Sequence, residues 1–232
     1  IVEAAAGKDL GTMAAVPVSR EEAENAVRQF ADVCVANHNA PRQTILSGPR
    51  SAIEAVVKEF NDNGIKAQRL PVGAAFHSPI VAPARDALAR FMATVEMRPA
   101  RFPVYSNTTA QPHAEDPTEL RQVLAEHLGR PVEFLAEIEA MYAAGARVFL
   151  GVGPKNVVEG LTEQILADRP YRVVRLDDQE GGLKGLLKGV GALFAEGVAL
   201  DLMPLFENRD CRELKRDELE RDGGKPLYPA HV

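Results

Sequence analysis

The sequence predicts an α/β protein made of two consecutive parts. Residues 11–72 hold four short runs of strand-forming residues and two amphipathic helical segments, in the order β-α-β-β-α-β. Residues 79–195 instead alternate helical segments with isolated short strands. The first order defines a ferredoxin-like unit, also called a split βαβ motif. The second is typical of a parallel sheet covered by helices.

Within the first part, strands are expected at residues 12–18, 33–38, 43–47 and 65–72, with a turn at residues 39–41. Ser19 is a suitable cap for the first helix, whose apolar residues recur at helical spacing. The second helix places Ile53, Val56 and Phe60 on one face and should stop at Asn63 and Gly64. These signals predict a small subdomain over residues 11–72.

The second part is expected to begin with a long helix after Pro79. Its predicted buried stripe consists of Ile80, Ala84, Leu88, Phe91 and Val95. Further strands are expected at residues 102–106, 147–150 and 171–176. Further helices are expected at residues 118–128 and 131–144, after the turn at 151–154 as far as residue 165, and at 183–195. Residues 208–232 are highly charged and are interpreted as a linker.

Composition narrows the functional class. A hydrophobic content of 46% with 26% charged residues is typical of globular proteins. The net charge of −6 argues against a general nucleic-acid or anionic membrane surface, and no window approaches the ~18 apolar residues of a membrane span. Cys34 and Cys211 show no metal spacing, which favours a reduced protein of the cytoplasm.

The residue most suited to chemistry is His77, at a predicted strand-to-helix junction. It follows an apolar stretch, and Ser78 and Pro79 behind it suit a helix cap and first turn. Capping explains Ser78 better than a nucleophilic role does. His77 can be a structural residue or a general base for a nucleophile elsewhere. No G-x-S-x-G elbow occurs in these residues, so that nucleophile is not identified.

Two other patterns favour structural interpretations. The segment 151–156 follows a strand and opens a helix, but Asn156 stands where a dinucleotide fingerprint has its third glycine, so a tight turn is expected. The carboxylates between Asp116 and Glu139 are spread around their helices and indicate solvated faces. The five histidines show no paired ligand spacing, and no metal site is expected.

Six segments occur in a characteristic order: GTMAAV at 11–16, NHNAPRQTILSG at 37–48, AAFHSP at 74–79, PVYSN at 103–107, HLGRPVEF at 127–134 and VGP at 152–154. Together they resemble the acyltransferase family of fatty-acid and polyketide synthases, the malonyl-CoA:acyl-carrier-protein transacylases. The resemblance covers roughly residues 5–200. It implies a ferredoxin-like small subdomain inserted into an α/β-hydrolase-like large subdomain, of which residues 1–10 and 73–200 would be parts, followed by a linker at 201–232.

The resemblance also implies site residues. His77 corresponds to the histidine of a Ser-His dyad that activates a serine against an acyl-CoA thioester. The backbone carbonyl of His127 corresponds to the group that orients this ring, and Asn39 and Asn107 correspond to positions lining the acyl cleft. Phe76 matches the pattern that excludes an α-methyl branch, so malonyl is expected over methylmalonyl.

No bound cofactor is implied: acyl-CoA is the substrate and the phosphopantetheine of an acyl carrier protein is the acceptor. The expected partners are that carrier protein and neighbouring synthase domains. The family's G-H-S-x-G elbow, its carboxylate-binding arginine and its oxyanion-hole glutamine would all precede Ile1, so we expect this chain to be part of a longer polypeptide. A non-catalytic module that docks a carrier protein or domain remains the alternative.

Overall fold

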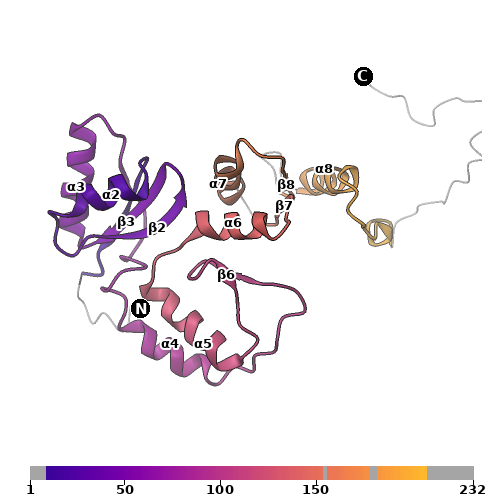
Figure 1. The fold of residues 1–232 in the computed structure, drawn as a ribbon, viewed down its shortest axis with the longest axis horizontal. Helices are drawn as coiled ribbons and strands as arrows, with labels where there is room; N and C mark the ends of the chain where they lie inside the picture. Colours follow the sequence, from indigo (N-terminus) through magenta and orange to yellow (C-terminus); the bar gives the residue numbers. More distant parts are fainter. Residues whose placement is uncertain (1–8, 154–155, 178–181, 208–232) are drawn as a thin grey trace, which may run out of the picture. The chain divides into compact units, whose positions relative to one another are not determined.

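The computed structural model describes residues 9–153, 156–177 and 182–207 (Figure 1). The chain divides into two compact units, residues 1–190 and 191–232. The second unit contains the end of α8 (Gly182–Ala195) and a short 3-10 turn, η2 (Met203–Leu205). The expected linker at 208–232, with Cys211 and His231, lies outside the described residues, as does most of the segment 1–10.

The first part of the chain forms a four-stranded antiparallel sheet in the order β2-β3-β1-β4. The strands are β1 (Thr12–Val16), β2 (Cys34–Ala40), β3 (Gln43–Gly48) and β4 (Gln68–Arg69). Two helices, α2 (Arg20–Val27) and α3 (Arg50–Asp62), complete the β-α-β-β-α-β order. The expected strand and helix order is therefore confirmed for this region.

The two faces of this sheet have different cores because side chains alternate along a strand. Ala14, Val16 and Leu46 pack with α2 and α3 in a cluster that includes Ile53 and Phe60. Met13, Ala36 and Ile45 point to the other face, where Leu70, Val72 and Phe76 cover them. Phe76 is thus the residue that joins the histidine-bearing turn to the sheet.

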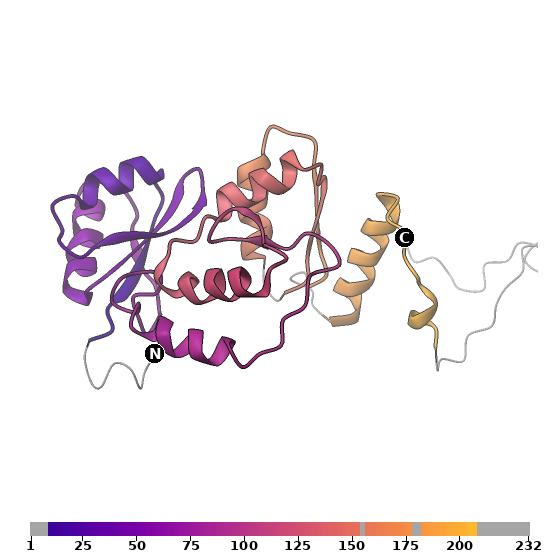
Figure 2. The same cartoon turned by 60° about the horizontal axis from the view of Figure 1, so that its bottom comes forward.

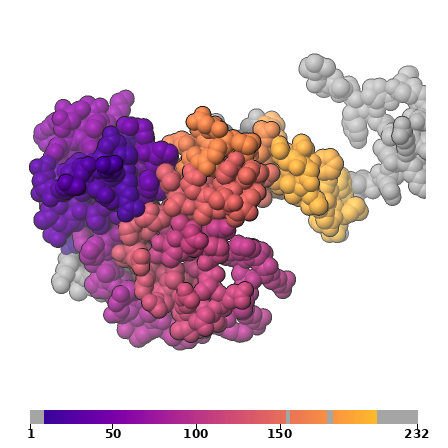
Figure 3. All heavy atoms as spheres, viewed as in Figure 1, coloured from indigo at the N-terminus to yellow at the C-terminus, as the bar shows by residue number. Residues whose placement is uncertain are grey.

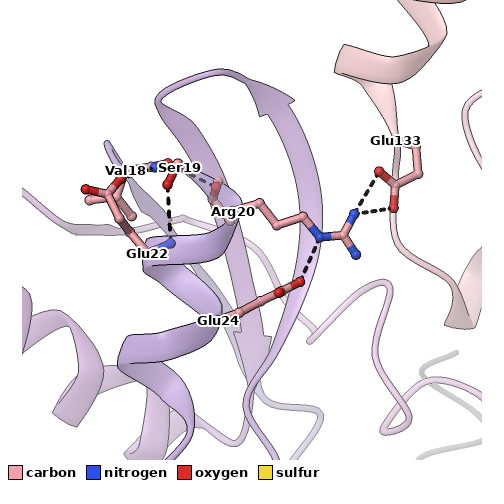
Figure 4. Close-up of polar contacts among 7 residues, drawn as sticks. Val18, Ser19, Arg20, Glu22, Glu24 and Glu133 are labelled. Carbon is pink, nitrogen blue, oxygen red and sulfur yellow. Dashed lines mark hydrogen bonds and ion pairs between the residues drawn. The ribbon is translucent and has the colours of Figure 1, made fainter.

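Local signals account for the first helix. The Ser19 hydroxyl accepts a hydrogen bond from the Glu22 amide at 3.2 Å, and the Glu22 carboxylate accepts one from the Ser19 amide at 2.8 Å (Figure 4). This reciprocal capping box satisfies two amides that the helix leaves unpaired. The second helix ends, as predicted, at Asn63 and Gly64, which has a left-handed φ of 78°.

Two boundaries in this region differ from prediction. The hairpin turn is Pro41 and Arg42, since Asn39 and Ala40 belong to β2. β4 is much shorter than expected, because three-residue turns interrupt the chain on either side of it. In those turns the Ala67 amide donates to the Ile65 carbonyl and the Val72 amide donates to the Leu70 carbonyl.

The second part contains α4 (Ala84–Met92), α5 (Pro117–Glu126), η1 (His127–Gly129), α6 (Phe134–Ala143), α7 (Val157–Leu166) and four further strands. β7 (Val148–Gly151) and β8 (Arg172–Arg175) pair in parallel, with α7 as the crossover. The expected parallel pairing of helix-linked strands is confirmed here. The strand expected at 102–106 is instead β5 (Tyr105–Ser106), which pairs antiparallel with β6 (Gln111–Pro112).

The helix after His77 begins later than predicted. Residues 79–83 form consecutive turns and α4 starts at Ala84, because Pro83 lacks the amide that a helix running from Pro79 would use there. The expected buried stripe is also wrong in part: Phe91 is 63% exposed. α4 and α5 lie side by side (Figures 1 and 2), joined by Arg121, which donates to the Met92 and Val95 carbonyls.

α6 begins at Phe134 rather than at residue 131. Residues 131–133 are not helical, because Val132 forms a parallel bridge with Asn37 of β2. The helices α6 and α7 then pack around Ala40, Ile138 and Leu161. In the portion of the chain that the structure covers, none of the helices combines the length and apolar character needed to cross a membrane.

Candidate functional site

His77 sits in a constrained turn. Its backbone has a φ of 59°, in the left-handed region that non-glycine residues rarely adopt. The His77 amide donates a hydrogen bond to the Leu128 carbonyl at 3.1 Å. The next residue, Ser78, is fully buried, donates its hydroxyl to the Ala75 carbonyl at 2.6 Å and accepts from the Ile80 amide at 3.3 Å. Ser78 therefore fixes the turn and does not cap α4 itself.

Two backbone carbonyls hold the His77 ring. Nδ1 lies 3.0 Å from the His127 oxygen and 3.1 Å from the Arg130 oxygen. A carbonyl oxygen can only accept a hydrogen bond, so Nδ1 must carry the proton. In the neutral ring this tautomer leaves the lone pair on Nε2, and Nε2 can take a proton from another group.

The His127 carbonyl lies at the carboxyl end of a helical segment. α5 ends at Glu126 and continues as the 3-10 turn η1, so this carbonyl belongs to its last turn. The negative end of a helix favours a neighbouring cation, typically by about 0.3–1 kcal/mol when exposed. The arrangement supports the positive charge that His77 would gain on accepting a proton.

The side chain of His127 adds a second contact. Its Nδ1 lies 2.7 Å from the Thr108 hydroxyl, and its ring meets the His77 ring edge to face, with centroids 4.9 Å apart. Burial lowers the pKa of His127, and proximity to His77 lowers it further. The two imidazoles are therefore in contact, and His127 favours its neutral form.

The segment that carries these carbonyls is anchored on both sides. The Val132 amide donates to the Ala36 carbonyl at 2.8 Å, and the His38 amide donates to the Val132 carbonyl at 2.8 Å. The Glu133 amide donates to the Asn107 carbonyl at 2.6 Å. The Glu133 side chain accepts from the Arg20 guanidinium at 2.8 and 3.0 Å (Figure 4), which links it to α2. The small sheet and the β5–β6 turn thus hold one segment behind His77.

The structure places the other predicted site residues as follows. Phe76 is half-buried against the sheet, Asn39 lies in β2, and Asn107 lies in the β5–β6 turn. The backbone connects Asn107 to the His77 segment through Glu133. Neither asparagine side chain hydrogen-bonds to His77 in the part of the chain described by the structure. The sequence did not indicate the Arg130 carbonyl or Thr108. Every residue has a backbone carbonyl, so residue type does not mark one, and Thr108 lies in a turn without a recognisable motif.

An apolar cavity of about 560 Å³ lies elsewhere, between α6, β7 and α7. Neither His77 nor any of its hydrogen-bond partners lines this cavity, so it is separate from the His77 site. Glu159 lines it with one buried, unpaired oxygen, and Glu137 on α6 is buried too, which corrects the solvated interpretation of that carboxylate. Burial raises the pKa of Glu137.

The same region argues against a dinucleotide site at 151–156. A Cβ added to Gly151 would lie 1.6 Å from the Glu159 carboxylate, so an anionic group already occupies the space beside this glycine. A phosphate would be repelled there. The tight-turn interpretation is favoured, although residues 154 and 155 lie outside the described chain. Across the described ranges, no cluster of three potential metal ligands occurs.

Comparison with known proteins places this geometry in context. Residues 4–184 match the family model described as the acyl transferase domain. The chain is 31% identical over 198 residues to the phenolphthiocerol synthesis polyketide synthase type I Pks15/1 of Mycobacterium marinum, an alignment covering 84% of this chain and 9% of that protein. It is 31% identical over 149 residues to the malonyl CoA-acyl carrier protein transacylase of Bacillus subtilis, covering 64% of this chain and 46% of that protein.

The fold has solved counterparts as well. The crystal structure of the malonyl CoA-acyl carrier protein transacylase from Clostridium perfringens is similar, with a TM-score of 0.73 and 26% identity. That similarity covers 82% of this chain and 59% of the other. The chain therefore spans only part of the length of each of these relatives.

Proposed function

Because this chain belongs to the acyl transferase domain family, we propose that it takes part in moving a malonyl-type acyl group from CoA to the phosphopantetheine thiol of an acyl carrier protein. The names of the Bacillus and Clostridium relatives support this choice of donor and acceptor. The observation that carries the proposal is the His77 ring, whose Nδ1 is engaged by two carbonyls while Nε2 remains available.

In this mechanism, Nε2 of His77 removes the proton of a serine hydroxyl as the serine oxygen attacks the thioester carbonyl carbon. The tetrahedral intermediate collapses, the carbon–sulfur bond breaks, and the CoA sulfur leaves with the proton from His77. The carrier protein's thiol then gives its proton to His77 as its sulfur attacks the acyl-serine carbonyl carbon. The bond to the serine oxygen breaks, and that oxygen takes the proton from His77. The bond between the His127 carbonyl and Nδ1 keeps the ring oriented through both steps.

We place the serine in polypeptide outside these 232 residues. Ser78 is the serine next to His77, and it is already committed to the turn through its bonds to Ala75 and Ile80. None of the serines in the sequence stands in a G-x-S-x-G elbow.

Phe76 is proposed to select the acyl group. Its ring packs with Leu70 and Val72 against Met13, Ala36 and Ile45, so it is fixed next to the catalytic turn. A fixed ring leaves no room for an α-methyl branch. Phe76→Ser should therefore raise the methylmalonyl-to-malonyl ratio of kcat/KM by about tenfold, the scale of one methyl group in an apolar pocket. Competition assays with the two CoA thioesters measure this ratio, and an unchanged ratio would contradict the assignment.

Asn39 and Asn107 are proposed to line the acyl cleft. They come from β2 and from the β5–β6 turn, the two elements that residues 131–133 join behind His77. Their amide groups are suited to hydrogen-bond a carboxylate or a thioester carbonyl.

The central test uses a polypeptide that includes this chain and a serine-bearing segment before it. His77→Asn removes the base, and asparagine tolerates the left-handed backbone at this position. Malonyl transfer to a carrier protein, followed by intact-mass spectrometry, should fall by about 10²–10⁴-fold. His113→Asn, in a histidine not bonded to His77, is the matched control and should retain activity. Undiminished transfer in His77→Asn would reject the base assignment.

A further inference from the structure

Thr108 and the His127 side chain form a layer behind His77 for which the mechanism above has no role. The Thr108 hydroxyl lies 2.7 Å from Nδ1 of His127, and Thr108 is only 7% exposed. Thr108 is itself fixed, because its amide donates to the Ser106 hydroxyl at 3.2 Å within the β5–β6 turn. The hydrogen bond from the turn therefore sets the orientation of the His127 ring.

Residue 127 contacts His77 twice, through its backbone and through its side chain. Its carbonyl oxygen lies 3.0 Å from Nδ1 of His77, and its ring stands at 61° to the His77 ring. Because one residue makes both contacts, anything that fixes its side chain also limits how far its carbonyl can move. Thr108 is the described side chain that hydrogen-bonds to this ring.

We infer that Thr108 and His127 are positioning residues for His77. The threonine–imidazole hydrogen bond holds the His127 carbonyl against Nδ1 of His77, which keeps the proton on Nδ1 and the lone pair on Nε2. The catalytic role of Thr108 and His127 rests on the proposed function. The tautomer of the His77 ring can nevertheless be measured without any reaction.

The test is nuclear magnetic resonance of ¹⁵N-labelled histidine rings in the full chain. Thr108→Val keeps the size of the side chain and removes the hydroxyl, whereas Thr108→Ser keeps the hydroxyl. Thr109→Val, at the exposed neighbouring threonine, is the matched control. We expect His77 to carry its proton on Nδ1 in the parent and in the Thr108→Ser and Thr109→Val variants. In Thr108→Val we expect a mixture of Nδ1–H and Nε2–H tautomers.

An unchanged His77 tautomer in Thr108→Val would overturn the inference. If that variant does not fold, a second variant still decides. His127→Phe should show the same mixed tautomer, and an unchanged His77 tautomer there would also overturn the inference.

Transfer assays separate this inference from the proposed function. Thr108→Val should lower kcat by about tenfold with little change in KM, and Thr108→Ser should restore it. If the tautomer changes as expected but the polypeptide that includes the serine-bearing segment transfers no acyl group, the positioning role stands and the proposed function fails.

Discussion

The two regions of the first unit bury their side chains in different ways. In residues 9–72 a four-stranded sheet and two helices cover each other's apolar side chains, and the space-filling view shows them as a continuous packed mass (Figure 3). From residue 73 on, each of the described sheets has two strands. Among the described residues of this unit, the exposed large apolar side chains lie in that second region: Phe91, Phe102, Val104, Leu150, Val152, Val157, Val158, Leu183 and Leu187.

Buried polar groups differ in the same way. In the first region the polar residues that are buried as a whole carry hydroxyls: Thr12, Thr44 and Ser47. In the second region they include two carboxylates, Glu137 and Glu159. A buried carboxylate is far more costly than a buried hydroxyl when it lacks a partner. The second region thus gives up stability at α6 and α7, where these two carboxylates are buried.

The largest expected effect contrasts two phenylalanines. Phe60 is 6% exposed in the core of the first region, and Phe91 is 63% exposed on α4. Phe60→Ala should cost about 3–5 kcal/mol of unfolding free energy, because it removes a packed ring and leaves a cavity. Phe91→Ala should stay within about 0.5 kcal/mol of the parent. Urea denaturation measures both, and equal losses would show that the two regions do not differ in burial.

A smaller effect is expected at Glu137, where burial raises the pKa of the carboxyl. Since the folded state holds this proton more tightly than the unfolded state does, stability falls as the pH rises from the unfolded pKa near 4.5 through the raised folded pKa. Glu137→Gln removes that penalty. The variant should unfold at a higher temperature than the parent at pH 8, and the difference should shrink towards pH 4.5. A difference that is independent of pH would contradict this account.

The smallest effect concerns the ion pair between the regions. Arg20 and Glu133 lie 2.8 Å apart, with their side chains 37% and 22% exposed. Solvent screens such a pair, so a double-mutant cycle with Arg20→Gln and Glu133→Gln should give a coupling of about 0.2–1 kcal/mol. The coupling should weaken in 1 M salt. A larger, salt-independent value would mean that the regions depend on each other more than their separate cores indicate.

Sequence patterns were most informative where the determining contacts are local. Ser19 and Glu22 lie three residues apart and set the start of α2, and Gly64 ends α3. The expected strand-to-helix junction at His77 was wrong in its elements, because β4 ends at Arg69 and α4 begins only at Ala84, so His77 lies in a run of turns between them. Pro83 was a local signal for the late start of α4. The prediction gave more weight to the helical spacing of the apolar residues around it.

The remaining differences depend on contacts between distant residues. Residues 131–133 have a helix-compatible pattern, yet they are not helical because Val132 pairs with Asn37, far away in the chain. Likewise, Glu137 looks like a surface residue on its own helix, and only the packing of α6 shows that it is buried. The Thr108–His127 contact joins a hairpin turn to a helix end, and the sequence of neither segment indicates it.

The Arg130 carbonyl, the second one that contacts the His77 ring, is placed there by the residue that follows it in the chain. Arg130 has φ −113° and ψ 149°, the extended conformation that a following proline imposes, and residue 131 is that proline. Alanine at position 130 would leave the oxygen in place, so a scan of side chains would pass over this contact without a signal. Natural variation should accordingly be tolerated at residue 130 and restricted at residue 131, because the proline at 131 sets the backbone conformation that places the Arg130 carbonyl.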